Sequence, residues 1–177
     1  MPRPAGRLAA LMVIGLCVPA CGRDQTPESS KTVPDGVYAV LRDSLNETDL
    51  LPLKDGEALV ADRHRYVKAD DQEPPRFLVV RAAPDVDLDL ADAPKAVEEG
   101  GEVVRVLLKL QPKAATALER LTRDQRGKQV AIVLGGEVVT VHKVRDVIKG
   151  GDAQITSCAP GAAKYLLEQL QARHEAK

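Results

Sequence analysis

Acidic side chains at regular spacing are the first candidates for chemistry in this chain of 177 residues. Apolar residues alternate with them in a run that contains Asp85, Asp87, Asp89 and Asp92. Oxygen ligands at such spacing suit Ca²⁺, but an EF-hand loop also needs Gly at its sixth position and Glu at its twelfth. Leu90 and Ala96 stand at those positions. We therefore interpret the run as a solvated acidic loop and predict no metal site.

The remaining reactive side chains do not combine into a catalytic set. His64, His142 and His174 are scattered and lack cysteines or acids at the spacing of a zinc site. No serine lies in the sharp turn of a nucleophile elbow. Gly135-Gly136 and Gly150-Gly151 lack the lysine of a phosphate loop, so they indicate turns. The sequence predicts no catalytic residue and no cofactor, and hence no enzyme.

The N-terminal residues 1–21 have the features of an export signal. Arg3 and Arg7 precede an apolar stretch, residues 8–18, which is shorter than the ~20 residues that a membrane-spanning helix needs. Val18-Pro19-Ala20-Cys21 resembles the lipobox of bacterial lipoproteins. That resemblance implies that Cys21 carries a lipid and becomes the new N-terminus. An ordinary cleaved signal that ends at Ala20, with Cys21 incidental, is the alternative.

The cysteines and the flanking charge define the expected location. Cys17 would leave with the leader, so Cys158 has no intramolecular disulfide partner. Cys158 is interpreted as a small half-buried hydrophobe, with a reactive thiol near a helix N-terminus as the alternative. Residue 23 is Arg rather than the Asp that retains lipoproteins at the inner membrane. We expect a lipid-anchored protein of the cell envelope that faces the periplasm or the exterior, at the outer membrane where there is one.

The composition is that of a folded domain and excludes some partners. Hydrophobic residues make up 44% of the chain, and 25 Lys and Arg nearly balance 26 Asp and Glu. A nucleic-acid binder needs an excess of cations to displace counterions, so we predict no nucleic-acid partner. Aromatic residues are only 2%, which leaves no stacking platform for bases or sugars.

The hydrophobic pattern divides the chain into four parts. After the leader, residues 1–21, a polar stretch at residues 22–34 is typical of a flexible tether. Residues 35–95 are predicted to hold a small β region, with strands at 36–42, 57–67 and 76–83, followed by the acidic loop. Residues 96–173 are predicted to form an α+β domain.

The α+β domain has the sharpest pattern. Apolar residues at every second position predict a strand over residues 103–110, and a hairpin is expected around Gly135-Gly136. A last strand is expected at residues 153–157. Two helical stripes follow a period of 3.6: Ala114, Ala117, Leu118 and Leu121, then Ala163, Leu166, Leu167 and Leu170. This order predicts a mostly antiparallel, ferredoxin-like sheet with both helices packed on one face.

The same segment resembles a known family. Residues 122–167 are similar to the head subdomain of the large periplasmic loop of SecD, in the SecDF family of the protein-export machinery. The matching residues are Thr122, Gly127-Lys128, residues 131–134, Gly136, Val138, Ile148, Gly150-Gly151 and residues 153–156. The likeness covers about residues 77–172. Departures lie at Gly135, at His142 and at Ser157-Cys158, and no segment matches the transmembrane helices that couple proton flow to the head in SecD.

This resemblance implies a related binding head rather than a motor. We expect a lipid-anchored envelope protein that binds polypeptide or another envelope protein and is linked to protein export. An exposed strand edge or the groove beside the hairpin is the expected contact surface, with Glu137, Thr140 and His142 as partner-binding residues. A structural envelope protein whose domain only packs or oligomerises is one alternative. A hydrolase or metal-dependent enzyme that uses the acidic loop is another.

Overall fold

The computed structural model describes residues 33–63, 74–98, 104–157 and 160–176. Cys21, most of the expected tether, His64 and Cys158 lie outside these ranges. The helices are η1 (Glu47–Leu50), α1 (Pro112–Asp124) and α2 (Pro160–Glu175). The strands are β1 (Gly36–Ala39), β2 (Arg42–Ser44), β3 (Glu57–Asp62), β4 (Arg76–Arg81), β5 (Lys95–Glu98), β6 (Val104–Lys109), β7 (Gln129–Leu134), β8 (Glu137–Lys143) and β9 (Asp152–Ser157).

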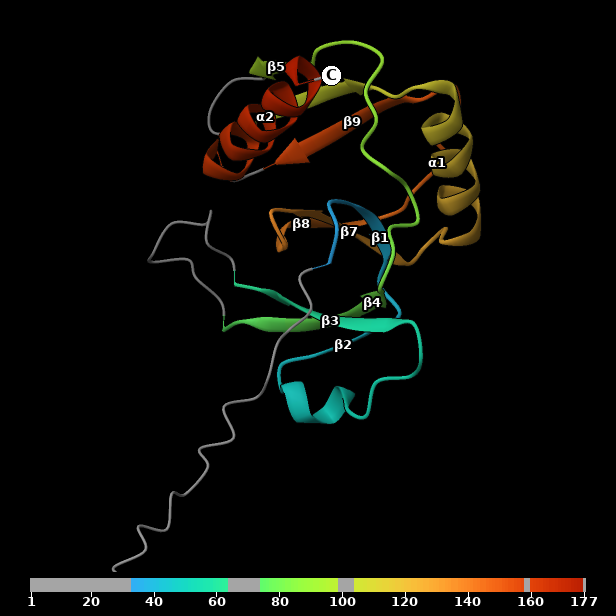
Figure 1. Ribbon diagram of the computed structural model, residues 1–177, viewed down its shortest axis with the longest axis vertical. Helices are drawn as coiled ribbons and strands as arrows, with labels where there is room; N and C mark the ends of the chain where they lie inside the picture. The colour runs from blue at the N-terminus through green and yellow to red at the C-terminus, as the bar shows by residue number, and fades with distance from the viewer. Residues whose placement is uncertain (1–32, 64–73, 99–103, 158–159, 177) are drawn as a thin grey trace, which may run out of the picture.

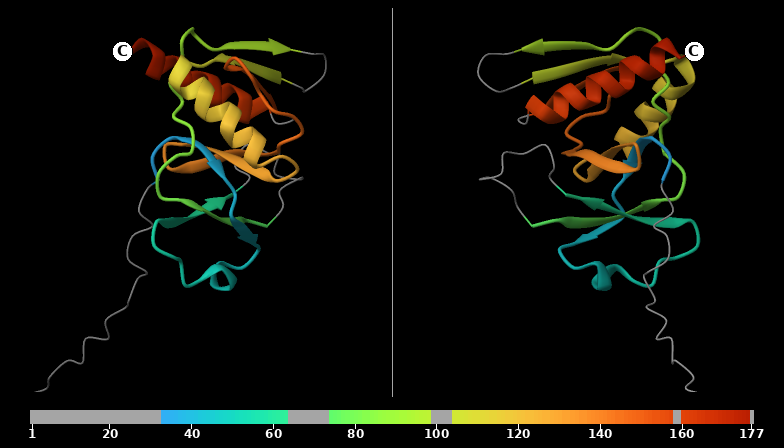
Figure 2. Two further views of the ribbon diagram at one scale, coloured as in Figure 1. Left: turned by 90° about the vertical axis from the view of Figure 1, so that its right-hand side faces the viewer. Right: turned by 60° about the vertical axis from the view of Figure 1, so that its left-hand side comes forward.

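These strands form three antiparallel sheets in the described part of the chain (Figure 1). The upper sheet has the order β5-β6-β9, the middle sheet β1-β7-β8 and the lower sheet β2-β4-β3. Both α-helices lie between the upper and middle sheets (Figure 2), and α2 packs against β5, β6, β9 and β8. The molecule is therefore a stack of layers, with the helices in the upper half.

Strand β7 is the centre of this stack because its side chains are buried on both faces. Val130, Ile132 and Leu134 belong to the upper core, which also contains the apolar sides of α1 and α2. Ala131 and Val133 point the other way, into a lower core between the middle and lower sheets. Alternation along a strand sends neighbouring side chains to opposite faces, so one apolar run contributes to two cores.

The helices form where the sequence predicts them. Pro112 starts α1 because the first turn needs no backbone donor from it, and the chain turns at Gly127, which has a φ of 79°. Ala114, Leu118 and Leu121 on α1 are buried, as are Ala163, Leu166 and Leu170 on α2. The two predicted stripes are thereby confirmed.

The α+β class and the hairpin are confirmed, but the prediction of a single sheet is wrong. β6 and β9 pair with each other, whereas the hairpin β7-β8 pairs with β1 from the N-terminal part of the chain. The ferredoxin-like order within one sheet is therefore not formed by the described strands. The physical reason is that β7 needs cover on both faces, which a sheet with helices on one face does not supply.

The described residues contain no helix that is long and apolar enough to cross a membrane.

Candidate functional site

A cavity of about 580 Å³ lies between the upper and middle sheets, beside α1. We call this cavity the slot. Its interior is mostly apolar: Leu108 and Leu110 come from β6 and the residue after it, Leu118 and Leu121 from α1, and Val130 and Ile132 from β7. Apolar interiors with a few polar groups at the margin are typical of ligand sites, so the slot is the leading candidate for binding.

Strand edges form two walls of the slot. Residues 153–156 of β9 border it consecutively, and so do residues 142–146 at the end of β8 and beyond. Neighbouring side chains of a strand point to opposite faces, so a consecutive run of lining residues means that the edge of the strand faces the slot. Within the sheets of the described residues, β9 and β8 are both edge strands. Backbone groups on such edges can pair with an added strand.

Thr122 holds the connection that forms one wall. Its side chain is buried, and its Oγ1 donates to the carbonyl of Leu118 at 2.8 Å. The same oxygen accepts a hydrogen bond from the backbone N–H of Ile148 at 3.0 Å. The backbone N–H of Val144 donates to the carbonyl of Lys128 at 2.8 Å. The wall of the slot is thus attached to the C-terminal end of α1.

Of the three predicted contact residues, His142 borders the slot, and Thr140 contacts His142 from the same strand. Thr140 Oγ1 and His142 Nε2 lie 3.1 Å apart, and the imidazole of His142 borders the slot. Burial lowers the pKa of His142 below its ordinary value, which favours an uncharged wall at neutral pH. Glu137 lies next to the hairpin turn, opposite Leu134, and borders neither this slot nor the second cavity described below.

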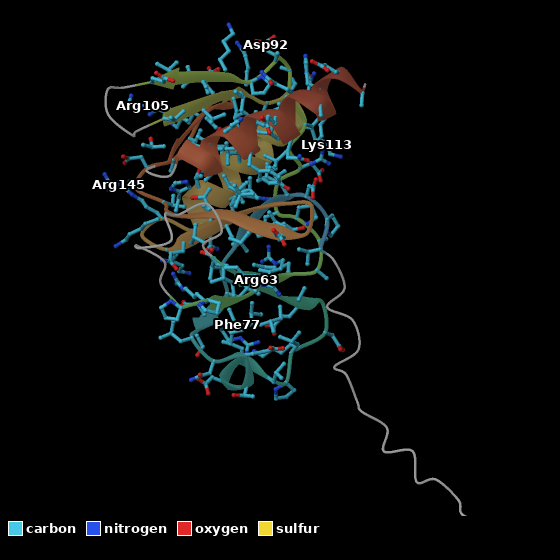
Figure 3. All side chains as sticks on the ribbon, turned by 90° about the vertical axis from the view of Figure 1, so that its left-hand side faces the viewer. Arg63, Phe77, Asp92, Arg105, Lys113 and Arg145 are labelled. Atoms are coloured by element: carbon cyan, nitrogen blue, oxygen red, sulfur yellow. The ribbon has the colours of Figure 1, made fainter. Side chains whose placement is uncertain are left out.

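Charged residues at the mouth of the slot were missed from the sequence. Lys143, Arg145 and Asp146 all border it and are all exposed. Figure 3 shows Arg145 at the side of the molecule, level with the boundary between the upper and middle sheets. The signal was present as a dense run of charges that begins at Lys143, the last residue of β8.

The acidic loop is more ordered than a solvated loop. Val86, Leu88 and Leu90 are buried, which turns the intervening acids outward. Asp85 accepts a hydrogen bond from the backbone N–H of Ala39 at 2.8 Å and forms an ion pair with Arg81. The carboxylate of Asp85 therefore fixes β1 rather than remaining free in water. No group of three potential metal ligands occurs among the described residues.

A second cavity of about 320 Å³ lies below the C-terminal end of α2, between Asp35, Asp87, Asp89 and Arg173. Asp35 forms an ion pair with Arg173 at 3.0 Å and accepts a hydrogen bond from the backbone N–H of Gly135 at 2.7 Å. These contacts tie the tip of the hairpin to β1 and α2, so we interpret this cavity as structural.

Comparisons with known proteins identify related sequences. The family described as "SecDF, P1 head subdomain" matches residues 63–172, more than half of the chain. Over 67 residues the chain is 42% identical to protein translocase subunit SecDF of Thermus thermophilus, covering 38% of this chain and 9% of that protein. Over 68 residues it is 38% identical to protein translocase subunit SecD of Acidaminococcus fermentans, covering 38% of this chain and 16% of that protein. The chain matches only a small part of the length of either relative.

Solved structures give weaker likenesses. One, described as "Structure and function of a membrane component SecDF that enhances protein export", is 30% identical, with 63% of this chain and 46% of that chain covered and a TM-score of 0.43. A second, described as "Crystal structure of SecDF in Super-membrane-facing form", is 25% identical, with 80% of this chain and 20% of that chain covered and a TM-score of 0.44.

Proposed function

Because this chain belongs to the SecDF P1 head family, we propose that it binds extended segments of other polypeptides and acts in protein export. The observation that carries the proposal is the slot, an apolar cavity bordered by β9 and β8, which are edge strands of their sheets in the described part of the chain. An extended segment could place alternate side chains in the apolar interior while its backbone pairs with one of these edges. Binding of this kind needs no catalytic residue.

We also propose that Cys21 carries a lipid that anchors the domain to a membrane. The order of positive residues, apolar stretch and lipobox in residues 3–21 supports lipidation. Several acyl chains hold a protein at a membrane where one chain does not, since each buried CH₂ contributes ~0.8 kcal/mol. The domain would then work beside the membrane, facing the periplasm or the exterior, and Arg23 favours the outer membrane where there is one. Labelled palmitate should appear on the full chain and be absent from a Cys21→Ser variant.

Photo-crosslinking in living cells tests polypeptide binding. A photoreactive residue is placed at Thr140, at His142 or at Gln154, which borders the slot from β9. Glu137 gives a comparison position on the same hairpin but away from the slot. Newly exported chains, identified by pulse labelling, should be captured from His142 and Gln154 and less from Glu137.

Two results would count against this function. Capture of no exported chain from any slot position would contradict polypeptide binding. Capture of a second copy of this protein alone would favour the alternative, in which the domain only packs or oligomerises. A position on the far side of α1, such as Lys113, controls for random collision, because Lys113 is exposed and does not border the slot.

A further inference from the structure

Two cations at the mouth of the slot have no anionic partner among the residues that the structure describes. Lys143 ends β8, and Arg145 follows two residues later; both are exposed and both border the slot. Within the described residues, the side chain of neither forms a hydrogen bond or an ion pair. Asp146, the anion beside them, lies 3.7 Å from Arg126. The mouth therefore carries a local positive charge in a protein whose formal net charge is -1.

The rest of the slot makes this charge more effective. The interior is apolar, and burial keeps His142 on its wall in the neutral form. Charges at the margin of a low-dielectric cavity act over a longer range than charges surrounded by water. A bound ligand that extends out of the slot past Lys143 and Arg145 would bind more tightly if it carried a negative charge at that point. A positive charge there would weaken its binding.

Resting on the proposed function, we propose that the slot selects extended polypeptide segments whose apolar residues are followed by acidic ones. The apolar side chains occupy the interior beside Leu118 and Leu121, and a Glu or Asp next to them meets Lys143 and Arg145. Segments flanked by Lys or Arg are disfavoured, because like charges at the mouth repel.

The strand edges favour a polypeptide over an anionic lipid. An acyl chain can fill an apolar cavity, but it offers no backbone groups to β9 or to the end of β8. The chemistry shared by the two ligands, an apolar body and an anionic end, means that the test must include both.

Matched peptides test the charge preference on the purified full-length chain by fluorescence anisotropy. All peptides share one alternating Val-Ser core and differ only in their flanks, which are Glu, Ser or Lys. The Glu-flanked peptide should bind about tenfold more tightly than the Lys-flanked one, with the Ser-flanked peptide between them. In about 0.5 M salt the difference should shrink to about twofold.

Charge reversal provides the matched comparison. In the double variant Lys143→Glu/Arg145→Glu the order of the peptides should reverse. The control Lys95→Glu/Lys113→Glu changes two exposed cations that do not border the slot and should keep the original order. Lys113 and Arg145 lie on opposite sides of the view in Figure 3.

The outcomes separate this inference from the proposed function. Equal binding of all three flanked peptides would overturn the charge preference and leave polypeptide binding standing. Binding of no peptide would overturn both. Decanoate binding in the slot together with binding of no peptide would identify an anionic amphiphile as the occupant.

Discussion

The hydroxyl of Thr122 is a single group on which one wall of the slot depends. It donates to the carbonyl of Leu118 and accepts from the backbone N–H of Ile148. Replacing it with Val keeps the shape but leaves that N–H without its acceptor. We expect Thr122→Val to lower the free energy of unfolding by about 1–3 kcal/mol, measured by urea denaturation.

Thr122→Ser is the matched control, because serine keeps the hydroxyl and loses only a methyl group. It should cost about 1 kcal/mol, the usual value for one buried methylene-sized group. A Val variant as stable as the unchanged chain would show that the hydrogen bond to Ile148 does not hold the connection.

His142 makes stability depend on pH in a definite direction. Burial lowers its pKa in the folded state below the ordinary 6.5, so the unfolded chain takes up the proton first as pH falls. The stability that the neutral imidazole contributes is complete above about pH 6.5 and is lost as pH falls from there toward the lowered folded value. His142→Gln should reduce the loss of stability between about pH 7.5 and pH 5, measured as urea midpoints. An unchanged pH profile would contradict a half-buried, neutral His142.

Among the elements, the connection from β8 to β9 is held by a close approach of its backbone to α1. Gly150 and Gly151 both have a positive φ, 73° and 79°. A Cβ on Gly151 would lie 2.7 Å from Cβ of Ala115 and 3.2 Å from the carbonyl oxygen of Leu110, whereas a Cβ on Gly150 meets nothing within 4 Å. Gly150→Ala should lower the free energy of unfolding by about 1–2 kcal/mol, because alanine strains a left-handed backbone. Gly151→Ala should cost about 2–5 kcal/mol, because overpacking adds to that strain.

Thermal unfolding of the two alanine variants checks this difference. Because both substitutions share the left-handed backbone, the gap between their Tm values isolates the contact with α1. Equal Tm values would mean that α1 and the connection can separate without cost.

Strands and turns whose pattern lies in neighbouring residues were predictable from the sequence. The strands with which they pair were not. Alternation predicted β6, and two glycines predicted the hairpin, because both patterns depend on neighbours in sequence. The pairing of β1 with β7 joins residues nearly a hundred positions apart, such as Val37 and Ile132. Only the unbroken apolar run of β7 hinted that it is covered on both faces.

The candidate site shows the same division. Glu137, Thr140 and His142 were predicted because they lie on the hairpin beside the expected groove, and of these His142 borders the slot. The slot forms only where the edge of β9 lies opposite the end of β8. These two strands belong to different sheets, and no pattern of neighbouring residues predicts that they face each other. Lys143 and Arg145 become informative only once the slot between those sheets is known.

At the scale of the whole molecule, β7 makes the two cores interdependent. Its residues alternate between the upper core and the lower core, so neither core is complete without this strand. Val33, at the start of the described chain, packs into the lower core, and β1 then crosses to pair with β7. A shared central strand favours one cooperative unfolding transition over two separate ones.

Alanine substitutions in each core test this coupling. Ile132→Ala removes a side chain from the upper core and Leu78→Ala one from the lower core; both residues are buried, and each change should cost about 2–5 kcal/mol. If the cores unfold together, hydrogen exchange in β6 should accelerate in both variants, each in line with its own loss of unfolding free energy, because the slowest amides exchange through global unfolding. Leu45→Ala is the control. Leu45 is 62% exposed, so this substitution should change the free energy of unfolding by no more than about 0.5 kcal/mol. Faster exchange of the lower sheet alone in Leu78→Ala would show that the upper layers are stable by themselves, and that β7 does not couple the two cores.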